Sequence, residues 1–491
     1  MSKQKIVLAL CSLLFLLLFW TGSTEAQGQG GGWSEPYRLS SEAGKASEAT
    51  LVADQYGYVH SFWRETLFED QNTIIQYARF DGGTWSAPND IYLTAEGIED
   101  MSAVVDQHGT LHIVWTERFF GPVYYSYAPV STALSAQSWA QPLRLDIPAG
   151  ILRFRVDSKG VFHILYINRS EELGVYYVRS EDQGVTWSEP VWLDPDILPG
   201  HTPDSLNFEL DETGGLHAVW FYGALERGEQ ADWIRYSHSL DGGKTWSVPF
   251  LIDQHIEGSE YDLSNASPVM TVQDKTVHVI WAAGDLPYRN HRFSIDAGQT
   301  WSTTVQIFGE LHGQAFDSLA VDGAGRVYFF GQIRYPIGIY EVYWDQTRWS
   351  KPSLVYLISE DGSEESFGDR VHAHLLHAAV RAGNQLVLTF GDPPADSERR
   401  LFAMHRTLGD IPPFETAPTQ TPAATAVSSP GPSPIQPTLT PMATVSVFDV
   451  ASAPPVEDIP SADSALRLIV VPVLLLLGGT FAYRWWSKNK L

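Results

Sequence analysis

The sequence has little cysteine and little positive charge, and its long apolar runs are confined to the two ends. The one cysteine, Cys11, lies inside the first apolar run, so the rest of the chain has no thiol for a disulfide or for nucleophilic catalysis. Lysine and arginine together number 32 against 58 aspartates and glutamates, which gives a formal net charge of −26. This balance argues against nucleic acid or an anionic surface as a partner.

The first apolar run indicates export. Residues 1–26 begin with two lysines, continue through an apolar stretch from Ile6 to Trp20 and end in Thr24-Glu25-Ala26. Basic start, apolar middle and small-x-small end are typical of a secretory signal peptide. We therefore expect the mature chain to begin near residue 27.

The second apolar run indicates a membrane anchor. Leu468 to Tyr483 is an uncharged run of 16 residues, with Arg467 before it and Arg484-Trp-Trp after it. Basic and aromatic flanks predict a single transmembrane helix over residues 464–485, with the tail 486–491 in the cytoplasm and the large domain outside. A buried globular helix is the alternative.

Between the ends, composition separates a stalk from a folded domain. Residues 411–463 are dominated by Pro, Thr, Ser and Ala, which cannot bury a core and predict an extended stalk. Residues 27–410 are rich in aromatic residues and long enough for a large single domain.

That domain contains a repeat. The phrase Trp-Ser-x-Pro recurs with variations at seven tryptophans: Trp33, Trp85, Trp139, Trp187, Trp246, Trp301 and Trp349. A second phrase, Asp-x-x-Gly-x-apolar-His with Trp three residues later, lies between copies and is clearest from Asp54, Asp106 and Asp211. Each unit predicts two strands joined by an Asp/Gly turn, a tyrosine-rich third strand and a fourth strand. Four-stranded repeats of this length are typical of β-propeller blades.

The ends of the repeat predict how the ring closes. The first copy, Trp33 to Leu39, has only a fourth strand, and the last, about His372 to Arg406, has only the first three. Together they complete one blade and remove the free sheet edges. We expect an all-β, seven-bladed propeller, with six blades as the alternative if the weak copy before Trp139 is a loop excursion.

Three turns between third and fourth strands share the pattern Ser-x-Asp-x-Gly-x-Thr-Trp. Their aspartates, glycines and tryptophans are Asp182, Gly184, Trp187, Asp241, Gly243, Trp246, Asp296, Gly298 and Trp301. The pattern resembles the Asp-box of the sialidase superfamily, which implies a six-bladed propeller. Because an Asp carboxylate can accept backbone N–H groups within such a turn while Gly takes a positive φ, we interpret these residues as structural, with Trp packed between blades.

The repeated histidines do not predict a metal site. His60, His112, His163, His217 and His278 occupy the same strand position in different blades, so they cannot converge on one ion. We interpret them as packed, hydrogen-bonded residues, and we expect neither a metal nor a cofactor.

The resemblance also implies a catalytic site: three arginines that clamp the sugar carboxylate, a Tyr nucleophile activated by Glu, and an Asp acid/base. The Phe/Tyr-Arg-Ile-Pro phrase that marks the family's first arginine is absent, and Tyr37-Arg38-Leu39 belongs to a predicted fourth strand. Residues expected at the mouth lie after second strands or at the start of first strands: Glu48, Arg64, Glu65, Asp100, Glu117, Arg118, Arg153, Asn168, Arg169, Tyr222, Arg227, Arg289, Arg334 and His374.

Two functions follow from these features. The favoured one is a monomeric, cell-surface-anchored propeller that recognises an extracellular glycan or protein, because the arginine phrase is missing and the chain has a stalk and an anchor. The alternative is an exo-α-sialidase-type hydrolase in which Arg64, Arg118 and another rim arginine form the clamp.

Overall fold

The computed structural model describes residues 32–118, 121–168, 173–197, 200–224, 230–263, 268–313, 316–334, 337–359, 376–392 and 400–418. All of them belong to the first of the two units into which the chain divides, Met1–Ala423. The predicted signal peptide, membrane helix and cytoplasmic tail lie outside the described residues, as does the predicted stalk after residue 418. Within the described residues, no helix has the length and apolar character that a membrane span requires.

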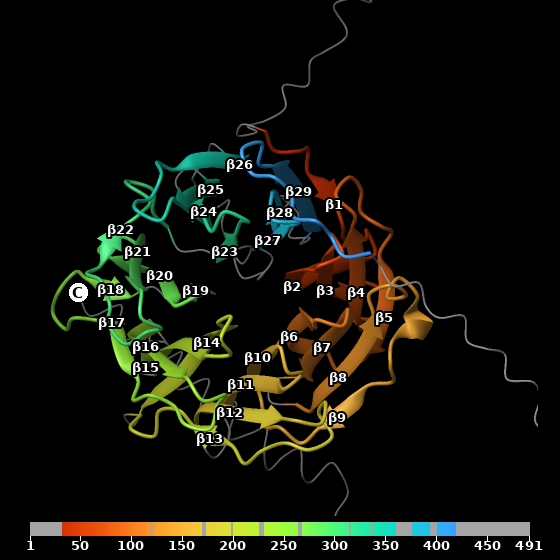
Figure 1. Cartoon of the computed structure of the whole chain (residues 1–491), viewed down its shortest axis with the longest axis horizontal. Helices are drawn as coiled ribbons and strands as arrows, with labels where there is room; N and C mark the ends of the chain where they lie inside the picture. Colours follow the sequence, from red (N-terminus) through yellow and green to blue (C-terminus); the bar gives the residue numbers. More distant parts are fainter. Residues whose placement is uncertain are drawn as a thin grey trace, which may run out of the picture. The chain divides into compact units, whose positions relative to one another are not determined.

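Seven antiparallel sheets surround an axis as the blades of a β-propeller (Figure 1). Blades 1 to 3 contain β2 (Gly44–Ala53), β3 (Val59–Leu67), β4 (Thr73–Phe80) and β5 (Asn89–Thr94); β6 (Ile98–Val105), β7 (Thr110–Glu117), β8 (Val123–Pro129) and β9 (Leu143–Leu145); and β10 (Ile151–Val156), β11 (Phe162–Asn168), β12 (Gly174–Ser180) and β13 (Val191–Trp192).

Blades 4 to 6 follow the same order, except that the inner strand of blade 5 is in two pieces, β18 and β19, which both pair with β20. Their strands are β14 (His201–Leu210), β15 (Leu216–Ala224), β16 (Gln230–Ser239) and β17 (Phe250–Gln254); β18 (Asp262–Leu263), β19 (Val269–Gln273), β20 (Thr276–Gly284), β21 (Tyr288–Ser294) and β22 (Val305–Gln306); and β23 (Asp317–Val321), β24 (Val327–Arg334), β25 (Ile337–Trp344) and β26 (Ser353–Ser359).

Blade 7 joins the two ends of the domain, as the sequence predicts. It contains β27 (His377–Arg381), β28 (Gln385–Asp392), β29 (Arg400–Thr407) and, as its outer strand, β1 (Tyr37–Arg38). Tyr37 pairs with Ala403 and Arg38 with Phe402, and the red β1 lies beside the blue β29 in Figure 1. The Leu39 N–H also donates to the Leu401 carbonyl at 2.8 Å. Opposite ends of the domain therefore close the ring.

The weak copy before Trp139 is a complete blade, which confirms seven blades and excludes six. In place of an Asp turn, the chain between β8 and β9 contains a 3-10 helix, η1 (Ala136–Ser138). Trp139 then packs against Phe62 and Tyr77 of blade 1, with ring centroids 5.8 Å apart in both pairs. The tryptophan keeps its place between blades although the turn has changed.

The repeated histidines are structural, as predicted. In four blades the histidine Nδ1 is 2.6 to 2.8 Å from a tyrosine hydroxyl of the third strand, in the pairs His60–Tyr77, His112–Tyr125, His163–Tyr177 and His217–Tyr236. His278 instead contacts His291 at 3.0 Å. Burial lowers the pKa of His163 and of His278 to about 4, so both are neutral at pH 7.

The three Ser-x-Asp-x-Gly-x-Thr-Trp turns have the expected local geometry. Asp182 accepts the Thr186 N–H at 2.8 Å and the Thr186 hydroxyl at 2.6 Å, and Gly184 has a φ of +88°. Bonds from the threonine and serine of each turn lower the pKa of Asp182 and Asp296 to about 2. Each carboxylate therefore accepts its hydrogen bonds within its own turn.

The tryptophans of these turns connect neighbouring blades. Trp246 meets the ring of Tyr177 from the preceding blade at 5.2 Å, and Trp301 meets Tyr236 in the same way at 4.8 Å. The core of the domain consists of such clusters between adjacent blades rather than one central core.

The start of the predicted stalk lies against the ring. The Phe414 N–H donates to the Ala382 carbonyl at 2.8 Å in blade 7, and the Ala417 N–H donates to the Gln55 carbonyl at 2.9 Å in blade 1. Ile411 is 7% exposed and belongs to the cluster between blades 6 and 7. Residues 411–418 therefore pack on the turns between first and second strands.

Candidate functional site

A cavity of about 500 Å³ lies on the axis of the propeller. Inner strands of all seven blades line it, namely β2, β6, β10, β14, β19, β23 and β27. Its volume falls within the range of roughly 300–1,000 Å³ that is typical of small-molecule sites. The convergence of seven inner strands makes this cavity the candidate functional site.

The wall of the cavity has two unlike halves. Among the described residues that line it, blades 2 to 4 contribute the charged groups apart from Asp317 and His377: Glu99, Asp100, Arg153, Arg155, Asp204 and Glu209. The rest of the wall is formed mainly by small and apolar residues, such as Ala49, Val269 and Leu376. A ligand in the cavity would therefore find most of its polar partners on one side.

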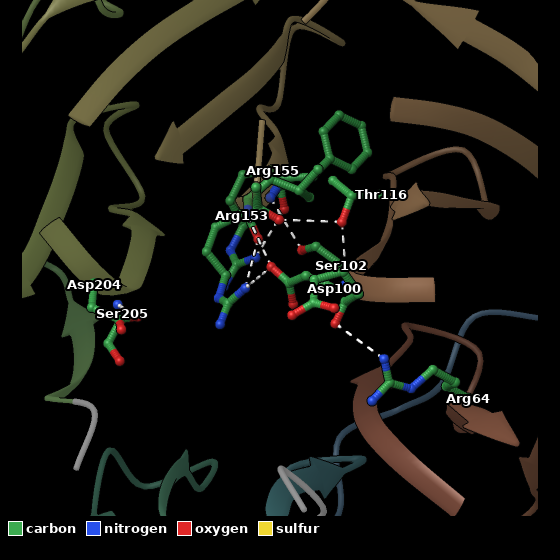
Figure 2. A network of polar contacts seen from close by, with 12 residues as sticks. Arg64, Asp100, Ser102, Thr116, Arg153, Arg155, Asp204 and Ser205 are labelled. Atoms are coloured by element: carbon green, nitrogen blue, oxygen red, sulfur yellow. Dashed lines mark hydrogen bonds and ion pairs between the residues drawn. The ribbon is translucent and has the colours of Figure 1, made fainter. Parts of the chain in front are cut away.

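Arg153 and Asp100 form the first ion pair of the polar wall (Figure 2). Arg153 Nη1 donates to Asp100 Oδ2 at 2.8 Å and to the Leu152 carbonyl at 2.6 Å. The Leu152 N–H donates to the same carboxylate oxygen at 2.8 Å. The side chain of Arg153 is 30% exposed and that of Asp100 is 10% exposed, so the pair faces the cavity and links blades 2 and 3.

Arg155, two residues further along β10, repeats this arrangement toward blade 4. Its Nη2 is 2.7 Å from Glu209 Oε1 and its Nε is 3.3 Å from Oε2, which is a two-point contact. Its Nη1 donates to the Phe154 carbonyl at 2.8 Å. Because residues two apart on a strand share a face, β10 presents both guanidinium groups to the cavity wall.

Irregularities in three inner strands shape the mouth. The register shifts between Ser47 and Ala49 in β2, between Ile98 and Asp100 in β6, and between Asp204 and Leu206 in β14. Such β-bulges redirect side chains and are frequent beside functional sites. In β14 the extra residue, Ser205, has a φ of +49°, which is unfavourable for a residue other than glycine.

Two glutamates that the sequence places at the mouth are instead buried between blades. Glu65 is 0% exposed and accepts a hydrogen bond from Trp63 Nε1 at 3.1 Å and another from the Ser41 hydroxyl. Glu117 is 5% exposed and accepts the Tyr92 hydroxyl at 2.8 Å. Neither lines the cavity, which corrects the expectation for both residues.

Tyr222 and Arg289 are buried as well. Tyr222 is 1% exposed, and burial together with the nearby Asp194 raises the pKa of its hydroxyl. Arg289 is 0% exposed: it holds Asp317 through Nε at 2.6 Å and Nη2 at 3.0 Å, and Nη1 donates to the Gly313 carbonyl at 2.8 Å. Both residues support the blades, which corrects their placement at the rim.

Two other predicted arginines are bound to neighbouring groups. Arg64 donates through Nε to the Ser47 hydroxyl at 2.7 Å and through Nη1 to the Ile98 carbonyl of the next blade (Figure 2). Arg118 is largely exposed, has a φ of +58° and pairs with Glu96. Neither lines the cavity.

Five of the predicted mouth residues have no described side chain. Arg169, Arg227 and His374 lie outside the described residues, as do the side chains of Glu48 and Arg334. Asp100 and Arg153 are the two predicted mouth residues that the structure brings together, whereas Arg155, Asp204 and Glu209 were missed. The sequence signal for Arg155 is its spacing from Arg153, since alternate residues of an inner strand face the same way.

The described residues do not assemble the site that the sialidase resemblance implies. Only two arginines, Arg153 and Arg155, are among the described residues that line the cavity, and each is paired with a carboxylate. Tyr92 and Glu117 do form a Tyr–Glu pair, but neither residue lines the cavity. Within the same residues, no three His, Cys, Asp or Glu side chains are grouped to hold a metal ion.

Solved structures of similar shape share the propeller fold. The BP39L lectin of Burkholderia pseudomallei has a TM-score of 0.54 and 15% identity over 76% of this chain and 100% of its own. A protein of unknown function from Dyadobacter fermentans has a TM-score of 0.46 and 14% identity over 78% and 100%. The NanB sialidase of Streptococcus pneumoniae has a TM-score of 0.42 and 12% identity over 78% and 71%.

At these identities the likeness concerns the fold alone, and of the three only the lectin has a TM-score above 0.5. A scan against models of protein families gives no match. A search of curated proteins gives none either.

Proposed function

We propose that this chain is a glycan-recognition propeller that binds its ligand in the axial cavity without cleaving it. The observation that carries the proposal is the polar wall of blades 2 to 4, where arginine donors and carboxylate acceptors alternate around a partly enclosed space. Sugar hydroxyl groups both donate and accept hydrogen bonds, so such a wall suits them. A carbohydrate ligand is also consistent with the likeness of the ring to the BP39L lectin.

Binding without hydrolysis is favoured by the state of the arginines. A sialidase-type clamp needs guanidinium groups that are free to meet a carboxylate, whereas Arg289 is fully enclosed by Asp317 and backbone carbonyls. Arg153 and Arg155 have carboxylate partners on the flanking blades. An exo-α-sialidase function, the alternative, would require these pairs to open.

A glycan array followed by a turnover assay tests this function. We expect the purified chain to bind a subset of glycans and to release no sugar from fluorogenic sialosides or from the glycans it binds. Release of free sialic acid would favour the hydrolase, and an absence of glycan binding would contradict the proposed function.

We further propose that the propeller is displayed on the outer face of a membrane by the predicted helix 464–485. The uncharged run and its basic and aromatic flanks support this location. Protease treatment of intact cells should remove the propeller and leave a small membrane-bound fragment. Full protection of the propeller, or its recovery in the soluble fraction, would contradict the proposal.

A further inference from the structure

The polar wall of the cavity offers an unused donor beside an unused acceptor. Arg153 uses only Nη1 in its bonds to Asp100 and to the Leu152 carbonyl, which leaves Nε and Nη2 without a partner among the described residues. Asp100 uses Oδ2 for Leu152 N–H and Arg153, and its Oδ1 is likewise unoccupied within the described part of the chain. Figure 2 shows the Arg153 side chain extending from β10 between Asp100 and the Asp204–Ser205 bulge.

An adjacent donor and acceptor match two neighbouring hydroxyl groups. One hydroxyl oxygen of a vicinal diol can accept from the guanidinium, while the other hydroxyl donates to the carboxylate. The fixed Arg153–Asp100 pair holds both groups at a set separation, because its carboxylate is also tied to the backbone of β10 by the Leu152 N–H. The site is therefore pre-organised, which lowers the entropic cost of binding.

The charge of the wall disfavours an acidic ligand. Among the described lining residues, the guanidinium groups of Arg153 and Arg155 are already paired with the carboxylates of Asp100 and Glu209. A ligand carboxylate would have to compete with these carboxylates in a partly enclosed space, where charge repulsion is weakly screened. A neutral ligand avoids that cost and keeps every hydrogen bond.

We infer that the cavity binds the terminal residue of a neutral glycan, with vicinal hydroxyl groups bridging Arg153 and Asp100. This inference rests on the proposed glycan-recognition function and adds the ligand class and its contacts. It also assigns the recognition to blades 2 and 3 rather than to the arginines of the rim.

The test uses the full chain, purified in detergent, and titration calorimetry with methyl glycosides. The neutral probes are the galactoside, glucoside, mannoside and fucoside, and the acidic probes are the glucuronide and the sialoside. We expect at least one neutral glycoside to bind more tightly than either acidic one. The Arg153→Gln variant should weaken that binding about ten- to a hundredfold, which is the usual effect of losing a hydrogen bond to a charged group.

Two further variants keep the test independent of folding. Asn207→Phe adds volume to the cavity lining at a residue without a hydrogen bond among the described residues, and it should abolish binding. Arg144→Gln changes an exposed arginine of the outer strand β9 and should leave binding unchanged. Thermal unfolding of each variant shows whether the fold is intact.

The outcomes separate the inference from the function on which it rests. A preference for the acidic glycosides, or neutral binding that survives either Arg153→Gln or Asn207→Phe, would overturn the inference and leave glycan recognition standing. If no glycan binds, either as a glycoside or on an array, the proposed function fails and the inference fails with it.

Discussion

Two arginine–aspartate pairs in the same ring have opposite relations to solvent. In the Arg289–Asp317 pair both side chains are no more than 1% exposed, and the guanidinium also donates to two backbone carbonyls. In the Arg153–Asp100 pair the side chains are 30% and 10% exposed, and part of the guanidinium is open to the cavity. The same two residue types therefore hold blades together in one place and offer a binding surface in the other.

Burial decides between these roles. Both charges of an enclosed pair lose their hydration, so removal of one partner leaves an uncompensated buried charge and strongly destabilises the fold. A partly exposed pair contributes little to stability. Loss of one charge should therefore cost far more stability in the enclosed pair than in the partly exposed pair.

Arg289→Gln should have the largest effect on stability. Loss of the guanidinium leaves the Asp317 carboxylate buried without a counter-charge, which typically costs about 3–5 kcal/mol. Urea unfolding at pH 7 measures this loss. Arg153→Gln is the matched control in the partly exposed pair and should cost less than about 1 kcal/mol. Equal losses in the two variants would contradict the assignment of separate roles.

Gly243→Ala should have the next largest effect on stability. Gly243 has a φ of +83°, and an added methyl group would collide with the hydroxyl of Tyr177 from the preceding blade. We expect a loss of about 2–4 kcal/mol in the free energy of unfolding, from backbone strain and overpacking together.

The adjacent Gly242 provides the control for that variant. Its φ is +71°, but an added methyl group would meet no atom within 4 Å. Gly242→Ala should therefore cost only the backbone strain of about 1–2 kcal/mol. If Gly243→Ala costs no more than Gly242→Ala, the contact between blades is unimportant.

Acid should destabilise the ring. Burial lowers the pKa of His163 and His278 to about 4, from an unfolded value of about 6.5, so the unfolded chain binds more protons between these values. The free energy of unfolding should fall as pH drops from about 6.5 toward 4. Burial raises the pKa of Asp317 to about 6, although Arg289 opposes this, and the aspartate contributes with the opposite sign.

The net effect of these three groups is a loss of about 2 kcal/mol between pH 7 and pH 5, at roughly 1.4 kcal/mol per pKa unit. Urea unfolding across this range should show a loss of this size or more, because burial also lowers the pKa of His60, His217 and His291. His163→Gln should flatten the pH dependence. A chain that becomes more stable on acidification would contradict the account of the histidines.

Arg153→Gln should have the smallest effect on stability. Its side chain is partly exposed and its partner Asp100 keeps the Leu152 N–H, so we expect a change below about 1 kcal/mol in urea unfolding. The same variant carries the predicted loss of glycan binding. A large loss of stability would instead place Arg153 with Arg289 among the structural residues.

The ring could be predicted from the sequence because its signals are local and repeated. Trp33, at the start of a lone fourth strand, and the last three strands of the domain together predicted how the ring closes. The Asp and Gly of each turn make their contacts within a few residues along the chain. The repeat before Trp139 has no Asp turn but keeps its tryptophan. Counting that tryptophan as a repeat gave the prediction of seven blades.

The cavity wall was harder to predict because burial depends on contacts between blades. Arg64, Arg153 and Arg289 all looked like rim arginines, yet one bonds to a neighbouring carbonyl, one faces the cavity and one is enclosed. Arg155 and Glu209 lie within strands and belong to no repeated phrase, so only the packing of blade 3 against blade 4 brings them together.

A crystal structure of the propeller with its strongest-binding neutral glycoside would show whether the ligand occupies the cavity. We expect a sugar ring in the axial cavity, with two neighbouring hydroxyl oxygens at about 3 Å from the Arg153 guanidinium and the Asp100 carboxylate. A sugar bound on the outer surface of the blades, with the cavity empty, would contradict it.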